Sequence, residues 1–95
     1  EIASMPCGAC LINTSRGEVV DECAVEAGIK SGHLGGYATD VLANEDFGNL
    51  SSNRLWKLVT EGHNVLITPH IGGCTMDAMH ATESIMANFL LKELR

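Results

Sequence analysis

Four side chains that can move a proton or bind an anion follow three short apolar runs of this sequence. They are Arg16, Asp40, Glu45 and His70. An arginine can hold a carboxylate through two parallel hydrogen bonds, and a histidine can exchange a proton near neutral pH. A carboxylate beside that histidine can hold the imidazole in one tautomer and stabilise its protonated form. Together these groups indicate an acid–base site for a small anionic substrate.

The three apolar runs predict three β-strands, because each run is short and bounded by glycine, proline or polar residues. A helix is expected to begin after an Asp21 N-cap and to end near Lys30, and a long helix to begin after Thr75. Segment 55–60 predicts a single helical turn. The predicted strands are 9–14, 34–41 and 65–68.

The order strand, helix, strand, short helix, strand, helix predicts an α/β fold with parallel strands and right-handed crossovers. Ligands of open parallel sheets bind beyond the carboxyl ends of the strands. If the strands are neighbours about 4.8 Å apart, the four side chains converge within roughly 10 Å. Three strands are few for a sheet that must be covered on both faces. We therefore expect the 95 residues to be a fragment that lacks the first half of a doubly wound domain.

Two features of the predicted helices concern packing. Gly28 lies inside the helix that follows Asp21, which costs about 1 kcal/mol relative to alanine unless close packing uses the missing side chain. Gly32 is placed to end that helix. The last helix carries one apolar stripe at three- and four-residue spacing, which we expect to lie in the core. The stripe consists of Met79, Thr82, Ile85, Met86, Phe89 and Leu90.

The charge balance excludes several classes of function. Lys and Arg number 6 and Asp and Glu 12, so the net charge is −6. Proteins that bind nucleic acids or anionic membranes usually carry clusters of Lys and Arg, and this sequence has none. No apolar run approaches the roughly 20 residues that span a bilayer, and the first ten residues do not read as a signal peptide. We therefore expect a cytoplasmic protein with neither a nucleic-acid nor a membrane partner.

Four cysteines leave redox or metal chemistry as alternative interpretations. Cys7 and Cys10 form a CxxC motif, but it runs into a strand and not into the helix start that favours a thiolate. Cys10 is therefore expected in the core and Cys7 in a loop. A zinc site built from the cysteines with His63, His70 or His80 lacks a second close ligand pair. We expect free thiols and no metal site.

Three blocks of the sequence resemble the signature blocks of one enzyme family. LINTSRGEVVD, SGHLGGYATDV and NVLITPHIGG occur in the order typical of the D-isomer-specific 2-hydroxyacid dehydrogenases. The resemblance implies that residues 1–95 are a partial dinucleotide-binding domain, the second half of a Rossmann-like doubly wound fold. By the same resemblance, the GxGxxG half and the substrate domain are expected to lie outside these 95 residues. It further implies NAD as the cofactor, with NADP possible, a small 2-oxo or 2-hydroxy acid as the substrate, and a homodimeric full-length parent.

The resemblance also implies a role for each candidate residue. Arg16 binds the substrate carboxylate and polarises its carbonyl, His70 is the general acid–base, and Glu45 keeps His70 charged for the reductive direction. Asp40 contacts the nicotinamide carboxamide. The other implied contacts with the nicotinamide are made largely through backbone. The implied cofactor-binding residues are Thr14, Ser15, Arg16, Asp40, His70 and Gly72.

The chain departs from the family pattern in two loops. Asp46 and Phe47 follow the glutamate where many relatives carry a proline, and residues 59–63 lengthen the region before the third strand. A second class of function also stays open, because some relatives are nucleotide-sensing binding proteins or corepressors. The chain is thus expected to belong either to an NAD-dependent dehydrogenase, inactive as an isolated fragment, or to such a sensor.

Overall fold

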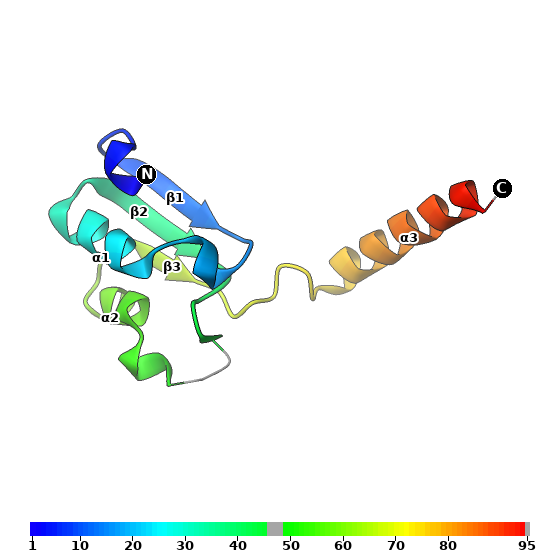
Figure 1. Cartoon of the computed structure of the whole chain (residues 1–95). Helices are drawn as coiled ribbons and strands as arrows, with labels where there is room; N and C mark the ends of the chain where they lie inside the picture. The colour runs from blue at the N-terminus through cyan, green and yellow to red at the C-terminus, as the bar shows by residue number, and fades with distance from the viewer. Residues whose placement is uncertain (46–48, 95) are drawn as a thin grey trace.

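Three parallel strands form one layer of the protein in the computed structural model, which describes residues 1–45 and 49–94 (Figure 1). The strands are β1 (Ala9–Asn13), β2 (Leu34–Thr39) and β3 (Val65–Ile67). Their spatial order is β1-β2-β3, and β2 pairs in parallel with both neighbours. The predicted α/β fold with three parallel strands is confirmed.

Helix α1 (Glu22–Ser31) confirms the first predicted helix. The Asp21 carboxylate caps it by accepting two backbone N–H groups of the first turn, at 2.9 and 3.3 Å. Gly32 ends it in the left-handed conformation, with φ of 78°. Gly28 is buried, and a Cβ there would lie 2.9 Å from Cγ of Leu34. The glycine inside the helix therefore lets α1 lie close against β2.

Helix α2 (Arg54–Thr60) is longer than the single turn predicted. The Asn53 side chain caps it by accepting the N–H groups of Leu55 at 2.9 Å and Trp56 at 3.0 Å. Leu55 and Leu58 are fully buried. Tertiary packing thus stabilises a helix too short to persist in isolation. Short 3₁₀ turns lie at Ile2–Ser4, Gly17–Val19 and Leu50–Ser52.

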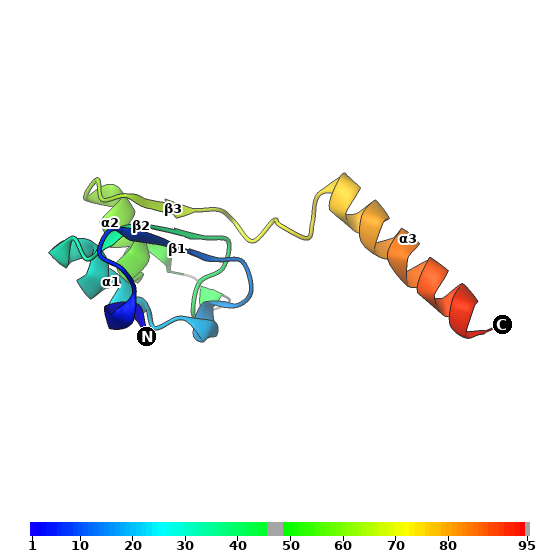
Figure 2. The same ribbon diagram turned by 90° about the horizontal axis from the view of Figure 1, so that it is seen from above.

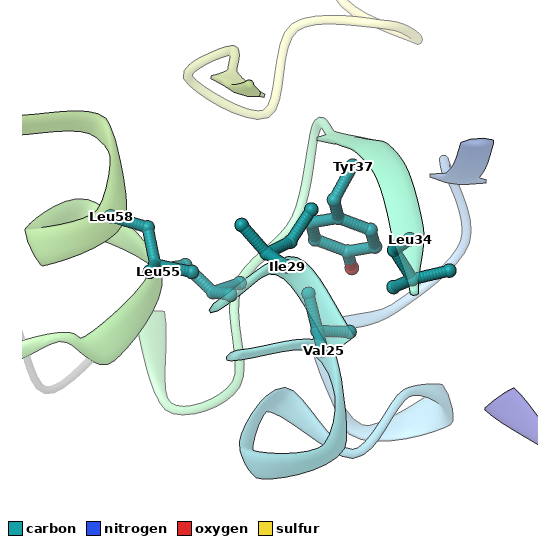
Figure 3. Close-up of a cluster of buried hydrophobic side chains, with 6 residues drawn as sticks. All are labelled: Val25, Ile29, Leu34, Tyr37, Leu55 and Leu58. Carbon is teal, nitrogen blue, oxygen red and sulfur yellow. The ribbon is translucent and has the colours of Figure 1, made fainter. Parts of the chain in front are cut away.

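The core lies between one face of the sheet and the two helices α1 and α2 (Figure 3). A register shift between β1 and β2 at Ala9 and Cys10 leaves one extra residue in β2, the arrangement of a β-bulge. Such a bulge lets Leu34 and Tyr37 both point to the helices. The buried cluster consists of Val25, Ile29, Leu34, Tyr37, Leu55 and Leu58.

The opposite face of the sheet is open in the part of the chain that the structure describes. Along β1 and β3 the exposed residues alternate with inward ones, as the pleat of a strand requires. Ile12 is 69% exposed and Leu66 62% exposed, and Cys10 is also exposed. The prediction that Cys10 lies in the core is wrong, because its side of β1 has nothing packed on it.

Helix α3 (Met76–Glu93) extends away from the sheet in both views (Figures 1 and 2). Its predicted cap is confirmed, since the Thr75 hydroxyl accepts the N–H of Ala78 at 3.2 Å. No residue of α3 is buried, and Phe89 is 57% exposed. The prediction that the apolar stripe lies in the core is therefore wrong for this structure. None of the helices in residues 1–45 and 49–94 is long and apolar enough to cross a membrane.

Candidate active site

The three strands end level with one another, which brings the loops after them to the same edge of the sheet. Asn13 of β1 pairs with Thr39 of β2, and Thr39 pairs with Ile67 of β3. The ladder continues one step further, because the N–H of Asp40 donates to the carbonyl of Asn13 at 3.1 Å. The segments that follow the three strands at this edge carry the predicted acid–base residues Arg16, Asp40, Glu45 and His70.

His70 and Glu45 are joined there by a hydrogen bond between Nδ1 of the imidazole and Oε1 of the carboxylate. The other oxygen of Glu45 accepts the N–H of Leu42 at 3.0 Å. This backbone hydrogen bond lowers the pKa of the Glu45 carboxyl, and the neighbouring His70 and Arg16 lower it further. Glu45 is therefore an anion at neutral pH. It leaves Nε2 as the imidazole nitrogen that can exchange a proton with a substrate.

Arg16, Glu45 and His70 line one hollow with a volume of about 320 Å³. This size is at the lower end of the range of about 300–1,000 Å³ found for ligand pockets. The Arg16 guanidinium is exposed and donates from Nη1 to the carbonyl of Ser15 at 2.7 Å. Because a guanidinium carries five N–H donors, it can still hold a carboxylate. The structure thus brings together the three residues for which catalysis was predicted.

Asn13 fixes the turn that carries Arg16. Its buried side chain accepts from the N–H of Ser15 at 3.1 Å and from the Ser15 hydroxyl at 3.0 Å. Its amide nitrogen donates to the carbonyl of Arg16 at 2.9 Å. Sequence reasoning missed this residue. The available signal was a polar side chain at the end of an apolar strand, which must find partners when it is buried.

Gly17 brings the loop that carries Glu45 against the turn that carries Arg16. A Cβ at this position would lie 2.0 Å from the carbonyl carbon of Leu42 and 2.1 Å from the nitrogen of Ala43. No side chain fits between two backbones at that separation. The glycine after Arg16 therefore serves close approach of the two loops.

The loop before Glu45 is held by three carboxylates. The consecutive backbone N–H groups of residues 42–44 donate to Glu45 at 3.0 Å, Glu22 at 2.8 Å and Glu18 at 3.4 Å respectively. Asn44 has φ of 57°, the left-handed conformation that asparagine tolerates better than most residues. Glu22, the first residue of α1, was not predicted to contribute to the site. Its carboxylate holds the loop by accepting the N–H of Ala43.

The Asp40 carboxylate ties the end of β2 to the segment that carries His70. It accepts the N–H groups of Ile71 at 3.1 Å and Gly72 at 2.8 Å, and the hydroxyl of Thr68 at 2.5 Å. The hydrogen bond from Thr68 and then those from Gly72 and Ile71 lower the pKa of Asp40. Asp40 therefore acts inside the chain as an anionic clamp on the segment that follows β3.

His70 itself lies in the left-handed region, with φ of 56°. Histidine, like asparagine, adopts this conformation more often than most residues, but it is still uncommon, and such backbones cost about 1–3 kcal/mol that surrounding contacts must offset. The contacts are the hydrogen bond from the His70 N–H to the carbonyl of Thr68 at 3.0 Å and the clamp of Asp40 on the next two residues.

The residues predicted to bind a nicotinamide all lie at this edge. Thr14 and Ser15 are exposed on the turn after β1. The Gly72 N–H is directed at Asp40, whose Oδ2 accepts no other hydrogen bond in the described residues and keeps a lone pair for an amide. A Cβ at Gly73 would meet nothing within 4 Å. The individual contacts with a nicotinamide stay predictions.

The alternative interpretations were redox chemistry at the cysteines and a zinc site, and the described part of the chain offers no further support for either. Residues 1–45 and 49–94 contain no group of three or more His, Cys, Asp or Glu that could hold a metal ion. All four cysteines are free and exposed, with Cys7 in a loop as predicted. Asp46 and Phe47, named above as departures from the family pattern, lie outside the described residues.

Known proteins resemble this chain over most of its length. A family model described as "D-isomer specific 2-hydroxyacid dehydrogenase, NAD binding domain" matches residues 1–72. The D-3-phosphoglycerate dehydrogenase of Escherichia coli (strain K12) is 42% identical over 92 residues, which are 97% of this chain and 22% of that protein. A glyoxylate reductase of Thermococcus litoralis is 37% identical over 91 residues, or 96% of this chain and 25% of that protein.

Solved structures resemble the chain to a similar extent. A D-lactate dehydrogenase from Sporolactobacillus superposes with a TM-score of 0.70 and 37% identity, covering 99% of this chain and 30% of that one. The NAD-dependent formate dehydrogenase from Staphylococcus aureus in complex with NAD superposes with a TM-score of 0.68 and 26% identity. The match covers 99% of this chain and 27% of that one. These matches confirm the predicted fold class, a Rossmann-like doubly wound coenzyme-binding fold. The chain spans 22% to 30% of the length of these four relatives.

Proposed function

The chain belongs to the D-isomer specific 2-hydroxyacid dehydrogenases, and on that premise we propose that it is the catalytic half of the coenzyme domain of an NAD-dependent dehydrogenase. The reaction interconverts a D-2-hydroxy acid and the corresponding 2-oxo acid. The observation that carries the proposal is that Arg16, Glu45 and His70 line one hollow at the carboxyl edge of the sheet. Residues 1–95 then form a partial dinucleotide-binding domain. The rest of the full-length protein supplies the GxGxxG half and a substrate domain.

Arg16 binds the substrate in this proposal. A 2-oxo acid presents a carboxylate next to its carbonyl, and a guanidinium fork can hold the carboxylate through two parallel hydrogen bonds. The same positive charge lies close to the carbonyl oxygen, where negative charge develops during reduction. Stabilising that developing charge is among the largest contributions a site can make to rate.

His70 moves the proton. In the reductive direction Nε2 donates a proton to the developing alkoxide, and in the oxidative direction it takes the proton back. Glu45, hydrogen-bonded to Nδ1, holds the ring in one orientation and balances its positive charge. A bound nicotinamide supplies or accepts the hydride.

The residues at the ends of the strands would hold the nicotinamide. Thr14, Ser15 and Gly72 would do so largely through backbone, together with Arg16 and His70, and Asp40 would accept a hydrogen bond from the carboxamide. We propose NAD as the natural cofactor, in line with the description of the matching family model. NADP stays an alternative, because a related structure from Xanthobacter autotrophicus Py2, with 37% identity and a TM-score of 0.54, is a complex with NADPH and MES.

The proposal extends to assembly and location as the resemblance implies them. The full-length protein is proposed to be a homodimer that works in the cytoplasm on a small 2-oxo or 2-hydroxy acid. Light scattering on the purified full-length protein tests the dimer directly. A mass of one chain at micromolar concentration would contradict it.

A substrate screen with the full-length protein tests the function. NADH consumption is followed with glyoxylate, pyruvate and hydroxypyruvate, and NADH binding is measured separately by fluorescence titration. The proposal predicts both binding and turnover with at least one of the three acids. Binding of NADH without turnover of any 2-oxo acid would contradict it and would favour a nucleotide-sensing relative.

A further inference from the structure

We propose that Thr68 is a positioning residue for His70, and that its hydroxyl acts by fixing the orientation of the Asp40 carboxylate. This inference rests on the proposed role of His70 as the general acid–base. It concerns a residue that lies two positions before the histidine. Thr68 lines a larger hollow of about 800 Å³ together with Asp40, Glu45 and His70, but not the smaller one that contains Arg16.

Every polar group of Thr68 is engaged in holding this segment. Its N–H donates to the carbonyl of Thr39 at 2.9 Å, which ties it to the end of β2. Its carbonyl accepts the N–H of His70 at 3.0 Å. Its hydroxyl donates to Oδ1 of Asp40 at 2.5 Å, and the side chain is half-buried. Thr68 therefore joins the sheet, the clamp and the histidine.

The hydroxyl is one of three donors that fix the orientation of the Asp40 carboxylate. The last torsion of an aspartate side chain is broad, so its orientation depends on these donors, and the Thr68 hydroxyl is the one that comes from a side chain. With Oδ1 held by the hydroxyl, that oxygen faces the N–H of Ile71 and Oδ2 faces the N–H of Gly72. The carboxylate lies close to the backbone of Gly72, because a Cβ on this residue would be 3.0 Å from Oδ2 of Asp40. Of the interactions that lower the pKa of Asp40, the one with Thr68 is the largest.

The clamp matters for His70 because the histidine backbone is in an uncommon conformation. With φ of 56°, His70 keeps its geometry only while contacts on both sides hold it. The carbonyl of Thr68 holds its own N–H, and Asp40 holds the two residues after it. If the carboxylate turns away, His70 can relax to a commoner conformation, which moves the imidazole from Glu45.

Two substitutions separate the hydroxyl from the shape of the side chain. Thr68→Val keeps the branched shape and removes the hydroxyl, whereas Thr68→Ser keeps the hydroxyl and removes the methyl group. Both are made in the full-length protein. Deuterium uptake by residues 70–74 reports the clamp without reference to catalysis, and steady-state kinetics with NADH and a 2-oxo acid report the consequence for His70.

We expect Thr68→Val to speed amide exchange at Ile71 and Gly72 on the order of tenfold, as loss of a hydrogen bond to a charged group allows. Its kcat should fall by a similar factor while KM for the 2-oxo acid changes by less than about twofold, since Arg16 is untouched. Thr68→Ser should match the wild type in both measurements. If Thr68→Val does not fold, Thr68→Ala removes the same hydroxyl with a smaller side chain.

Three results would overturn the proposal. The first is wild-type exchange at residues 71 and 72 in the valine variant, and the second is an equal loss of kcat in the serine variant. The third is a rise in KM with kcat unchanged. If the wild type reduces no 2-oxo acid, the proposed function fails, and the exchange data alone still decide whether Thr68 holds the segment.

Discussion

His70 and Glu45 share a hydrogen bond from Nδ1 to Oε1 although they lie 25 positions apart and leave the sheet after different strands. Each is held by its own set of contacts. Glu45 is tied to the loop after β2 by the N–H of Leu42, and His70 is held beyond β3 by Thr68 and Asp40. The pair is therefore prepared by the fold before any substrate arrives. Such preparation is what general acid–base catalysis needs.

Glu45→Gln should lower kcat for reduction of a 2-oxo acid in the full-length protein. Glutamine keeps the length of the side chain but removes the charge that balances a protonated imidazole. We expect a fall of about 10–100-fold, smaller than the 10²–10⁴-fold that general acid–base catalysis supplies in full. Steady-state kinetics provide the measurement. Glu83→Gln, an exposed position on α3, is the matched control and should leave kcat unchanged. Equal rates for the two variants would remove Glu45 from the mechanism.

Arg16→Lys should weaken substrate capture. An ammonium group is a point charge and does not reproduce the two parallel hydrogen bonds of a guanidinium. We expect kcat/KM for the 2-oxo acid to fall by about tenfold or more, since hydrogen bonds to charged groups contribute about 1.5–3 kcal/mol. Arg54→Lys is the control, because Arg54 pairs with Glu26 on the surface at 2.5 Å. The role of Arg16 is contradicted if its lysine variant keeps the wild-type specificity constant.

Gly17→Ala should destabilise the protein and displace the loop that carries Glu45. The added Cβ meets the backbone of Leu42 at 2.0 Å, and neither loop can yield without breaking its own hydrogen bonds. We expect a loss of at least about 1–3 kcal/mol in the free energy of unfolding, measured by urea denaturation. Gly73→Ala is the control, because a Cβ there meets nothing within 4 Å. Equal stability of the two variants would show that the approach of the two loops is looser than described.

Acidification should loosen the site through Asp40. Its folded pKa is lowered from the ordinary value of 3.8, first by the Thr68 hydroxyl and then by the N–H groups of Gly72 and Ile71. A lowered folded pKa adds stability that is present above the unfolded pKa and is lost as pH falls through the folded one. The protection factors of the amides of residues 71 and 72, which correct the exchange rates for their intrinsic pH dependence, should therefore fall below about pH 4. In Asp40→Asn this acid-dependent step should vanish. An unchanged step in that variant would assign it to another group.

Much of the fold could be predicted from the sequence because its signals are local. Asp21 and Gly32 mark the two ends of α1, and Thr75 marks the start of α3. The short apolar runs predicted the strands, and the alternation of strands and helices predicted a parallel sheet. In such a sheet the chain must leave each strand at the same edge, which is why Arg16 and His70 could be placed together without coordinates.

The supporting contacts could not be predicted, because they depend on which loops meet. Asn13, Thr68 and Glu22 hold the site through hydrogen bonds. Those of Thr68 and Glu22 join segments that are far apart in the sequence, and that of Asn13 closes a tight turn. Nothing in the spacing of these residues identifies the partner. The prediction that the apolar stripe of α3 lies in the core was wrong for a related reason. The periodicity predicts an apolar face, but it does not indicate which part of a protein covers that face.

The central claim is that His70 transfers the proton in a site completed by Arg16 and Glu45. Its most direct test compares the full-length wild type with His70→Ala in single-turnover reduction of a 2-oxo acid by bound NADH. We predict that the variant still binds NADH and, at saturating NADH, reacts about 10²–10⁴-fold more slowly. A reaction rate near that of the wild type, with both proteins saturated with NADH, would contradict the account.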